Sequence, residues 1–173
     1  MMKRRLNLGC GKDIKPKAEG WINMDYYYKG EGVDIIHNFI EFPYPFEDEC
    51  FDEIYAAHVL EHTPFIYINK DGLLKDIFFV FMEELHRILK PKGVLTAITP
   101  YSPSHMAFGN IQHYRHFNES WVDQFTADAW ENFYTTAKFK VLSVEFTNME
   151  VILPYFLRMG RTNLGIFQHL SKR

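Results

Sequence analysis

The sequence holds 173 residues, of which 47% are hydrophobic and 17% aromatic, and its formal net charge is -3. This length suits one domain with a core of its own, and the composition excludes a disordered chain. The small negative charge provides no global positive field for nucleic acid, and two cysteines are too few for a disulfide framework.

No segment has the pattern of a targeting peptide or a membrane span. The N-terminus is basic but lacks an apolar stretch, and no run approaches the roughly 18 apolar residues of a spanning helix. We therefore predict one cytoplasmic domain over residues 1–173 with a core over 4–147, and neither a membrane nor a nucleic-acid partner. The tail over 156–173 has no predicted structure and is left open as helix, strand or homodimer contact.

Short apolar runs alternate with helical patterns along the first hundred residues, an order typical of a parallel sheet with helices on both faces. Strands are predicted where such runs are bounded by Gly, Asp or Pro. These runs are residues 5–8, 21–25, 33–37, 53–57 and 94–99.

Two helices are predicted from apolar residues spaced three and four apart. The first covers 71–89 and ends at Lys90-Pro91-Lys92-Gly93, and the second covers 119–133 with Asn118 as its cap. Alternation then predicts a strand over 139–146. Residues 150–155 are expected to pair back on it as an antiparallel hairpin, through a connection at Thr147-Asn148-Met149.

The candidate site lies where the predicted strands end, because ligands of open parallel sheets bind beyond the carboxyl ends of the strands. Strand one ends in Gly9-Cys10-Gly11, which lets a ligand approach the backbone. Strand two ends in Asp25, which can accept hydrogen bonds from both hydroxyls of a ribose. Together they predict a nucleoside ligand, although the glycine pair alone also suits a tight turn and Asp25 alone a turn or a cap.

The residues after the glycine pair argue against a dinucleotide. A third glycine and a helix N-terminus for a pyrophosphate are missing, since Lys12-Asp13-Ile14-Lys15-Pro16 follows instead. Asp13 would repel a phosphate, and Pro16 leaves little room for a helix before strand two. Asp13 suits a ligand that carries positive charge, such as an amino group or a sulfonium.

Five ordered blocks make residues 4–100 resemble the class I S-adenosylmethionine-dependent methyltransferases, particularly the small type 11 group. The blocks are LNLGCG at 6–11, NMD at 23–25, PYPFEDECFDEIY at 43–55, HVLEH at 58–62 and ELHRILKPKG at 84–93. The resemblance implies an α/β, Rossmann-like fold of seven strands, six parallel and one antiparallel, with S-adenosyl-L-methionine lying across the first four.

The resemblance also implies roles for single residues. The glycine loop would contact the amino acid part of the cofactor, Asp25 the ribose, and Asn38 the adenine, where the family usually has an aspartate. Phe39 or Ile40 would pack on the adenine face. The predicted cofactor-binding residues are Asn7, Gly9, Cys10, Gly11, Asp13, Asp25, Asn38, Phe39, Ala57 and His58.

Catalysis of methyl transfer requires a positioned acceptor and, where needed, a base. His62, His113 and His116 are the candidate catalytic residues, because His62 follows strand four and the other two lie in the polar loop after strand five. Each has a structural alternative in holding its loop. No metal site is predicted, since no carboxylate neighbours the loop histidines at 105, 113 and 116.

The acceptor is expected to be a small molecule, because the motifs of amino-directed and pyrimidine-carbon nucleic-acid methyltransferases are absent. Two alternatives remain. One is a module or subunit that binds S-adenosylmethionine without catalysis, and the other is a small nicotinamide-dependent reductase. The reductase is disfavoured by the missing third glycine and the lack of a Tyr-x-x-x-Lys pair.

Overall fold

The computed structural model describes residues 2–68, 74–126, 134–148 and 164–172. A seven-stranded sheet contains β1 (Arg5–Leu8), β2 (Trp21–Asp25), β3 (Ile35–Ile36), β4 (Phe51–Ala57), β7 (Leu89–Pro100), β8 (Phe139–Asn148) and β9 (Leu164–Lys172). A second sheet pairs β5 (Tyr67–Ile68) with β6 (Leu74–Lys75). The helices are α1 (Ile77–Ile88) and α2 (His105–Gly109), with 3-10 turns η1 (Lys17–Glu19), η2 (Leu60–His62) and η3 (Trp121–Phe125).

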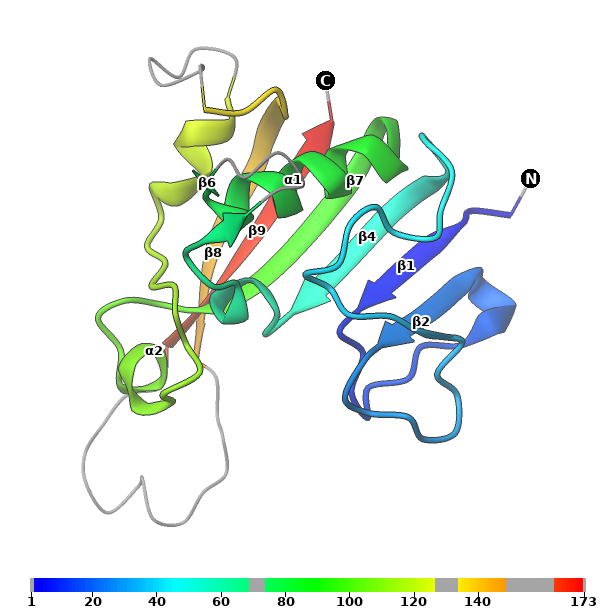
Figure 1. Ribbon diagram of the computed structural model, residues 1–173, viewed down its shortest axis with the longest axis horizontal. Coiled ribbons are helices and arrows are strands. Elements are labelled where there is room, and N and C mark those ends of the chain that lie inside the picture. The colour runs from blue at the N-terminus through cyan, green and yellow to red at the C-terminus, as the bar shows by residue number, and fades with distance from the viewer. Residues whose placement is uncertain (1, 69–73, 127–133, 149–163, 173) are drawn as a thin grey trace.

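The large sheet has the order β3-β2-β1-β4-β7-β9-β8 (Figure 1). The first five strands in this order are mutually parallel, whereas β9 is antiparallel to both β7 and β8. Strand β8 therefore runs in the same direction as β7. The six parallel strands and one antiparallel strand confirm the fold that the resemblance implies.

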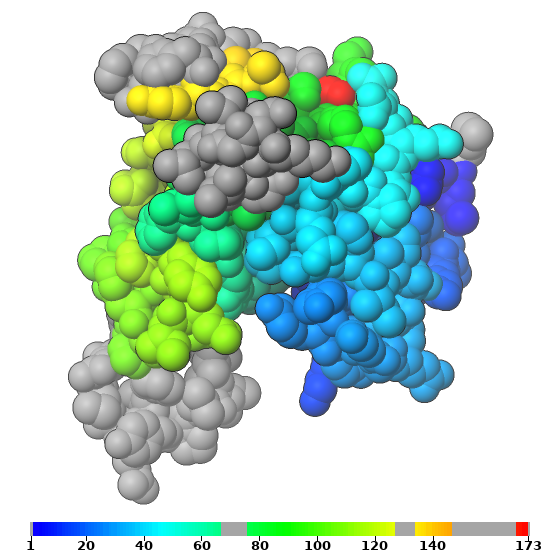
Figure 2. Space-filling model, viewed as in Figure 1, coloured from blue at the N-terminus to red at the C-terminus, as the bar shows by residue number. Residues whose placement is uncertain are grey.

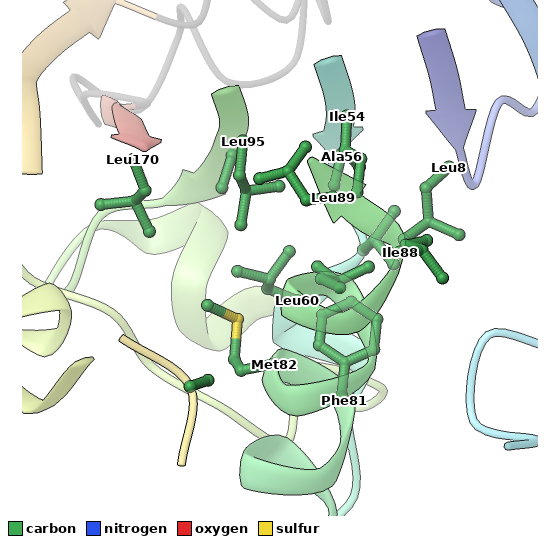
Figure 3. Packing of buried hydrophobic residues seen from close by; sticks show 14 of the residues in the cluster. Leu8, Ile54, Ala56, Leu60, Phe81, Met82, Ile88, Leu89, Leu95 and Leu170 are labelled. Atoms are coloured by element: carbon green, nitrogen blue, oxygen red, sulfur yellow. The ribbon is translucent and has the colours of Figure 1, made fainter. Parts of the chain in front are cut away.

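The core lies between α1 and one face of this sheet. Leucines and isoleucines of β1, β4 and β7 point toward Phe81 and Met82 of α1, and Leu60 lies between them (Figure 3). Full burial of each such side chain stabilises the fold by about 1.5–3 kcal/mol. This packing fixes the strands relative to α1 and so fixes where their carboxyl ends meet.

Helix α1 begins later than the sequence predicts. Asp76 is its N-cap, with a side chain that accepts a hydrogen bond from Phe78 N at 2.8 Å. Leu74 and Lys75 precede this cap and pair with β5 as a strand, so the predicted start at residue 71 is wrong there, and 69–73 lie outside the described residues. The sequence pattern extends to residues before the cap, because Leu74 happens to lie at helical spacing from the apolar residues of α1.

The helix predicted over 119–133 is also wrong in its described part. Residues 121–125 form the 3-10 turn η3 with Ser120 as the preceding residue, and Asn118 instead accepts a hydrogen bond from Ser120 N in a local turn. The predicted apolar face is nevertheless buried at Trp121, Val122 and Phe125. Residues 127–133 lie outside the described part of the chain.

The strand predicted over 139–146 is confirmed as β8, but the predicted hairpin connection is wrong. Thr147 and Asn148 continue β8 and pair with Gly165 and Leu164 of β9. The antiparallel neighbour of β8 therefore comes from the tail, and it lies between β7 and β8 rather than at the edge of the sheet. Residues 150–155 lie outside the described residues.

The remaining strands differ from expectation mainly in length. Strand β3 is confined to two residues, whereas β4 and β7 begin before residues 53 and 94.

Among the helices of the described residues, none has the length and apolar character needed to cross a membrane.

Candidate functional site

A pocket of about 570 Å³ lies at the carboxyl ends of β1, β2 and β4. Figure 2 shows the molecule hollowed between the blue segment near residues 20–40 and the yellow-green segment near residues 105–120. Six of the predicted cofactor residues line this pocket. They are Gly9, Gly11, Asp25, Asn38, Phe39 and His58.

The glycine loop after β1 needs both of its glycines, for different reasons. Gly9 and Gly11 have φ values of +63° and +49°, a conformation that L-residues with side chains rarely adopt. A Cβ on Gly9 would lie 2.4 Å from Cγ2 of the buried Val59, whereas a Cβ on Gly11 would meet no atom within 4 Å. Gly9 therefore allows close packing inside the protein, and Gly11 leaves open space at the pocket.

Asp25 connects the end of β2 to this loop. Its Oδ2 accepts a hydrogen bond from Gly11 N at 2.8 Å, and its Oδ1 accepts from Tyr27 N and Tyr28 N, both at 2.8 Å. A carboxylate offers about four acceptor sites, so three backbone donors leave capacity for a ligand hydroxyl. Asp25 thus both shapes the loop and remains able to bind a ribose.

Two buried asparagines, Asn7 and Asn23, hold the backbone of the loop that follows β1. Asn7 donates to Asp13 O at 2.7 Å and to Asn23 Oδ1 at 2.9 Å, and Asn23 exchanges hydrogen bonds with the backbone of Lys15. Asn7 is buried and is not among the residues that line the pocket. The structure therefore places this predicted cofactor residue where it positions the loop backbone.

Three further predicted cofactor residues are not among the pocket-lining residues. The Asp13 side chain is 69% exposed and pairs with Lys15, and Ala57 is paired with Ile98 in the sheet. Cys10 is buried, and burial, followed by the charge of Asp25, raises the pKa of its thiol to about 11. Cys10 is therefore a protonated thiol at neutral pH and offers no thiolate nucleophile.

On the predicted adenine side, Asn38 and Phe39 follow β3. Asn38 Oδ1 accepts a hydrogen bond from Ile40 N at 3.3 Å, and Ile40 lines the same pocket. The Phe39 ring packs edge-to-face on Phe81 of α1, with centroids 6.1 Å apart. These contacts fix an apolar surface next to an amide that keeps acceptor capacity.

The opposite side of the pocket is formed by the segment after β4. His58 has φ +57°, an unusual conformation for a non-glycine residue, and its Nδ1–H donates to Glu61 Oε1 at 3.1 Å. His62 lies in η2 and lines the pocket, and burial lowers the pKa of its imidazole below the ordinary value. The imidazole of His62 is therefore mostly neutral at pH 7.

The loop after β7 contributes His113 to this side. The rings of His62 and His113 are edge-to-face, with centroids 4.9 Å apart. His116, the third predicted catalytic residue, packs its ring against Phe108 with centroids 4.1 Å apart and is not among the pocket-lining residues. The structure thus joins His62 and His113 and leaves His116 apart, and of these three predicted catalytic residues only His62 lines the pocket itself.

Arg115 fastens the two loops of this side together. Its backbone N–H donates to Glu61 O at 3.1 Å, and its guanidinium donates to Thr63 O at 3.2 Å and Pro64 O at 2.7 Å. The same guanidinium binds the carboxylate of Asp76, the cap of α1, at 2.9 Å. The segments that carry His62 and His113 are consequently held in one frame with α1.

Sequence reasoning missed several residues that line the pocket. Tyr26, Tyr27 and Tyr28 follow Asp25 directly, and Gln112 and Tyr114 flank His113. A run of aromatic residues after an acidic strand end was a usable signal for the first group. The second group belongs to the polar loop that already supplies the candidates His113 and His116, although Gln112 and Tyr114 are not themselves among the predicted site residues.

An α/β protein with a glycine turn after the first strand and an acid after the second has the architecture of a nucleoside-cofactor-binding domain. The family model described as methyltransferase domain, type 11, matches residues 4–97. This match covers more than half of the sequence, so the chain belongs to that methyltransferase family, which confirms S-adenosyl-L-methionine as the cofactor. Among curated proteins, none matches the sequence significantly.

Solved structures share the fold at low sequence identity. A SAM-dependent methyltransferase from Methanosarcina mazei aligns over 98% of this chain and 92% of its own, with TM-score 0.63 and 15% identity. One from Archaeoglobus fulgidus aligns over 98% and 86%, with TM-score 0.63 and 13% identity. The [4+2]-cyclase SpnF aligns over 98% and 74%, with TM-score 0.57 and 14% identity. The likeness shows the fold alone, since one fold hosts different reactions.

Proposed function

We propose that the protein transfers a methyl group from S-adenosyl-L-methionine to a small-molecule acceptor. The observation that carries the proposal is a single pocket with two chemically different sides. One side presents the glycine loop and Asp25, and the other presents His58 and His62. A cofactor and its acceptor must share such a space for one group to pass directly between them.

The residues present fit this cofactor. The pocket volume falls in the usual range for small ligands, about 300–1,000 Å³. Open space beside Gly11 allows the amino acid part to lie on the backbone, and Asp25 retains an acceptor site for a ribose hydroxyl. Phe39 and Ile40 supply an apolar surface for a base.

When bound, the cofactor supplies a methyl group on a positively charged sulfur. The chain then has to hold the acceptor in line and remove a proton where the acceptor carries one. Two residues support this role for the segments after β4 and β7, because His62 lines the pocket and the ring of His113 packs against the ring of His62. His58 is held by Glu61 and contributes to the same side.

The proposal is tested by calorimetric titration with S-adenosylmethionine, followed by a screen of small-molecule alcohols, phenols, carboxylates and amines that measures release of S-adenosylhomocysteine. We expect cofactor binding and turnover on at least one acceptor class. Binding without turnover across the screen favours a non-catalytic module instead. Absence of binding by folded protein contradicts the proposal.

A further inference from the structure

Three side chains at the acceptor side of the pocket form a cluster that the sequence does not suggest. Glu61 and His62 of η2 and His113 after α2 each offer one ligand atom, and these atoms lie within 4.8 Å of one another. The loop histidines have no carboxylate beside them in sequence. Folding supplies one, because Glu61 lies about fifty residues earlier in the chain.

Both histidines are held in the tautomer that a metal ligand requires. His62 Nδ1 lies 3.1 Å from Gln112 O, and His113 Nδ1 lies 2.9 Å from Met106 O. A carbonyl oxygen only accepts, so both Nδ1 atoms carry a proton, which leaves Nε2 as the ring nitrogen that can bind a metal. Metal-binding histidines usually donate their second ring N–H to a carbonyl or carboxylate in this way.

Glu61 gives an independent sign of a missing partner. Its side chain is only 1% exposed, and Oε1 accepts from His58. Oε2 is buried and has no hydrogen-bonding partner within the part of the chain that the structure describes. A buried carboxylate oxygen without a partner is costly, and a bound cation would remove this cost.

The surrounding frame keeps the three side chains together. Arg115 donates its backbone N–H to Glu61 O, and its guanidinium donates to Thr63 O and binds Asp76. Ligand atoms around a tetrahedral ion lie about 3.3 Å apart at metal–ligand distances near 2 Å. The ligand atoms lie within 4.8 Å of one another, so each pair must approach by at most about 1.5 Å to reach this separation.

We propose that Glu61, His62 and His113 bind a divalent first-row transition-metal ion such as Zn²⁺. Two imidazoles favour such an ion over Mg²⁺ or Ca²⁺, which prefer oxygen ligands. Three protein ligands leave a coordination position for another molecule. Because His62 lines the pocket, that position is next to the space that receives the acceptor.

The site narrows the acceptor class, a step that rests on the proposed methyl transfer. The ion binds an oxygen of the acceptor, which points to an alcohol, a phenol or a carboxylate. For a hydroxyl, the proton is lost to solvent as the oxygen binds the ion. The oxygen then forms a bond to the methyl carbon while the carbon–sulfur bond breaks and sulfur keeps the electron pair. His62 serves here as a ligand and not as the base.

The test uses the full chain, freed of metal by chelation and titrated with Co²⁺, whose visible absorption reports the ligands. We expect saturable binding with the spectrum of a mixed nitrogen and oxygen site. His113→Ala and Glu61→Gln should each weaken binding by about 100-fold. His105→Ala, which changes the first residue of α2 and lies outside the cluster, should bind as the parent does. Thermal melting of each variant shows whether it is folded.

Absence of saturable binding, or unchanged affinity in folded His113→Ala, overturns the inference, and this variant remains informative if Glu61→Gln does not fold. S-adenosylhomocysteine is titrated into the same samples. Binding of the nucleoside without binding of Co²⁺ overturns the metal site and leaves the proposed function intact. Binding of Co²⁺ without the nucleoside supports the metal site and contradicts the proposed function.

Discussion

The two sides of the pocket are built in opposite ways. On the side of β1 and β2, the side chains of Asn7 and Asn23 hold the backbone in place. The groups that face the pocket there are the main chain of the glycine loop and the carboxylate of Asp25. On the side after β4 and β7, the backbone carbonyls of Gln112 and Met106 hold the side chains of His62 and His113. That side offers imidazole nitrogens.

This difference matches the two tasks that the pocket is proposed to perform. A backbone surface fits a cofactor that is the same compound in every turnover. The entropic cost of ordering the glycines is offset by the buried amide network of Asn7 and Asn23. Imidazoles and a carboxylate can bind a metal or move a proton, which is chemistry that backbone groups cannot supply. Substitutions on one side should therefore leave the task of the other side largely intact.

The largest expected effect separates the two glycines of the loop. Gly9→Ala should lower the free energy of unfolding by about 3 kcal/mol, because its Cβ overlaps Val59 in addition to the strain of a positive φ. Gly11→Ala carries the strain without the overlap and should lose about 1 kcal/mol. Urea denaturation monitored by circular dichroism measures both. Equal losses would contradict the assignment of Gly9 to packing and Gly11 to the pocket.

The frame of the opposite side is tested at Arg115. Arg115→Ala should lower the free energy of unfolding by about 2 kcal/mol. This is less than the loss expected for a fully buried ion pair, because Asp76 is partly exposed to solvent. Arg115→Lys keeps the charge but cannot contact the carboxylate and two carbonyls at once, so it should recover only part of the loss. Chemical denaturation of the three proteins gives the values. Full recovery by lysine would show that charge alone, and not the shared frame, matters.

A smaller effect concerns Asp34, which accepts from Asn23 N at 2.8 Å and pairs with Lys17. Burial alone would raise the pKa of Asp34, but these two partners lower it below its ordinary value. Because the folded state lowers the pKa of Asp34, the ionised carboxylate stabilises the protein at pH values above the unfolded pKa of about 3.9. This stabilisation is lost as the pH falls through the folded-state pKa.

Asp34→Asn should therefore be about 1 kcal/mol less stable than the parent at pH 7, with the difference shrinking below about pH 4. Denaturation curves at several pH values measure it. A difference that stays constant into acid would mean that the hydrogen bonds of Asp34 do not depend on its charge.

The side that presents backbone could largely be predicted from the sequence. Strands β1 and β2 match their predicted bounds because each is a short apolar run with a clear stop at Gly9 or Asp25. Neighbouring parallel strands then bring their ends together without further information. The hydrogen bonds of Asn7 to Asp13 O and Asn23 could not be predicted in the same way, because sequence position alone does not tell whether a polar side chain faces a ligand or the backbone of its own loop.

The other side could be predicted only in part. His62 and His113 were identified as candidates, but their contact with each other and with Glu61 depends on how the loop after β7 folds back. The position of β9 was missed for a similar reason, since its pairing with β7 joins segments about seventy residues apart. Local periodicity carries no signal for such long-range contacts, and it also placed the start of α1 before its cap at Asp76.

Titration of S-adenosylhomocysteine into the parent, Asp25→Ala and His113→Ala tests the division of the pocket most directly. Asp25→Ala removes a charged acceptor and should weaken binding by about 10- to 100-fold, whereas His113→Ala should bind within about threefold of the parent. Affinity that is unchanged in folded Asp25→Ala, or lost equally in both variants, would contradict the account.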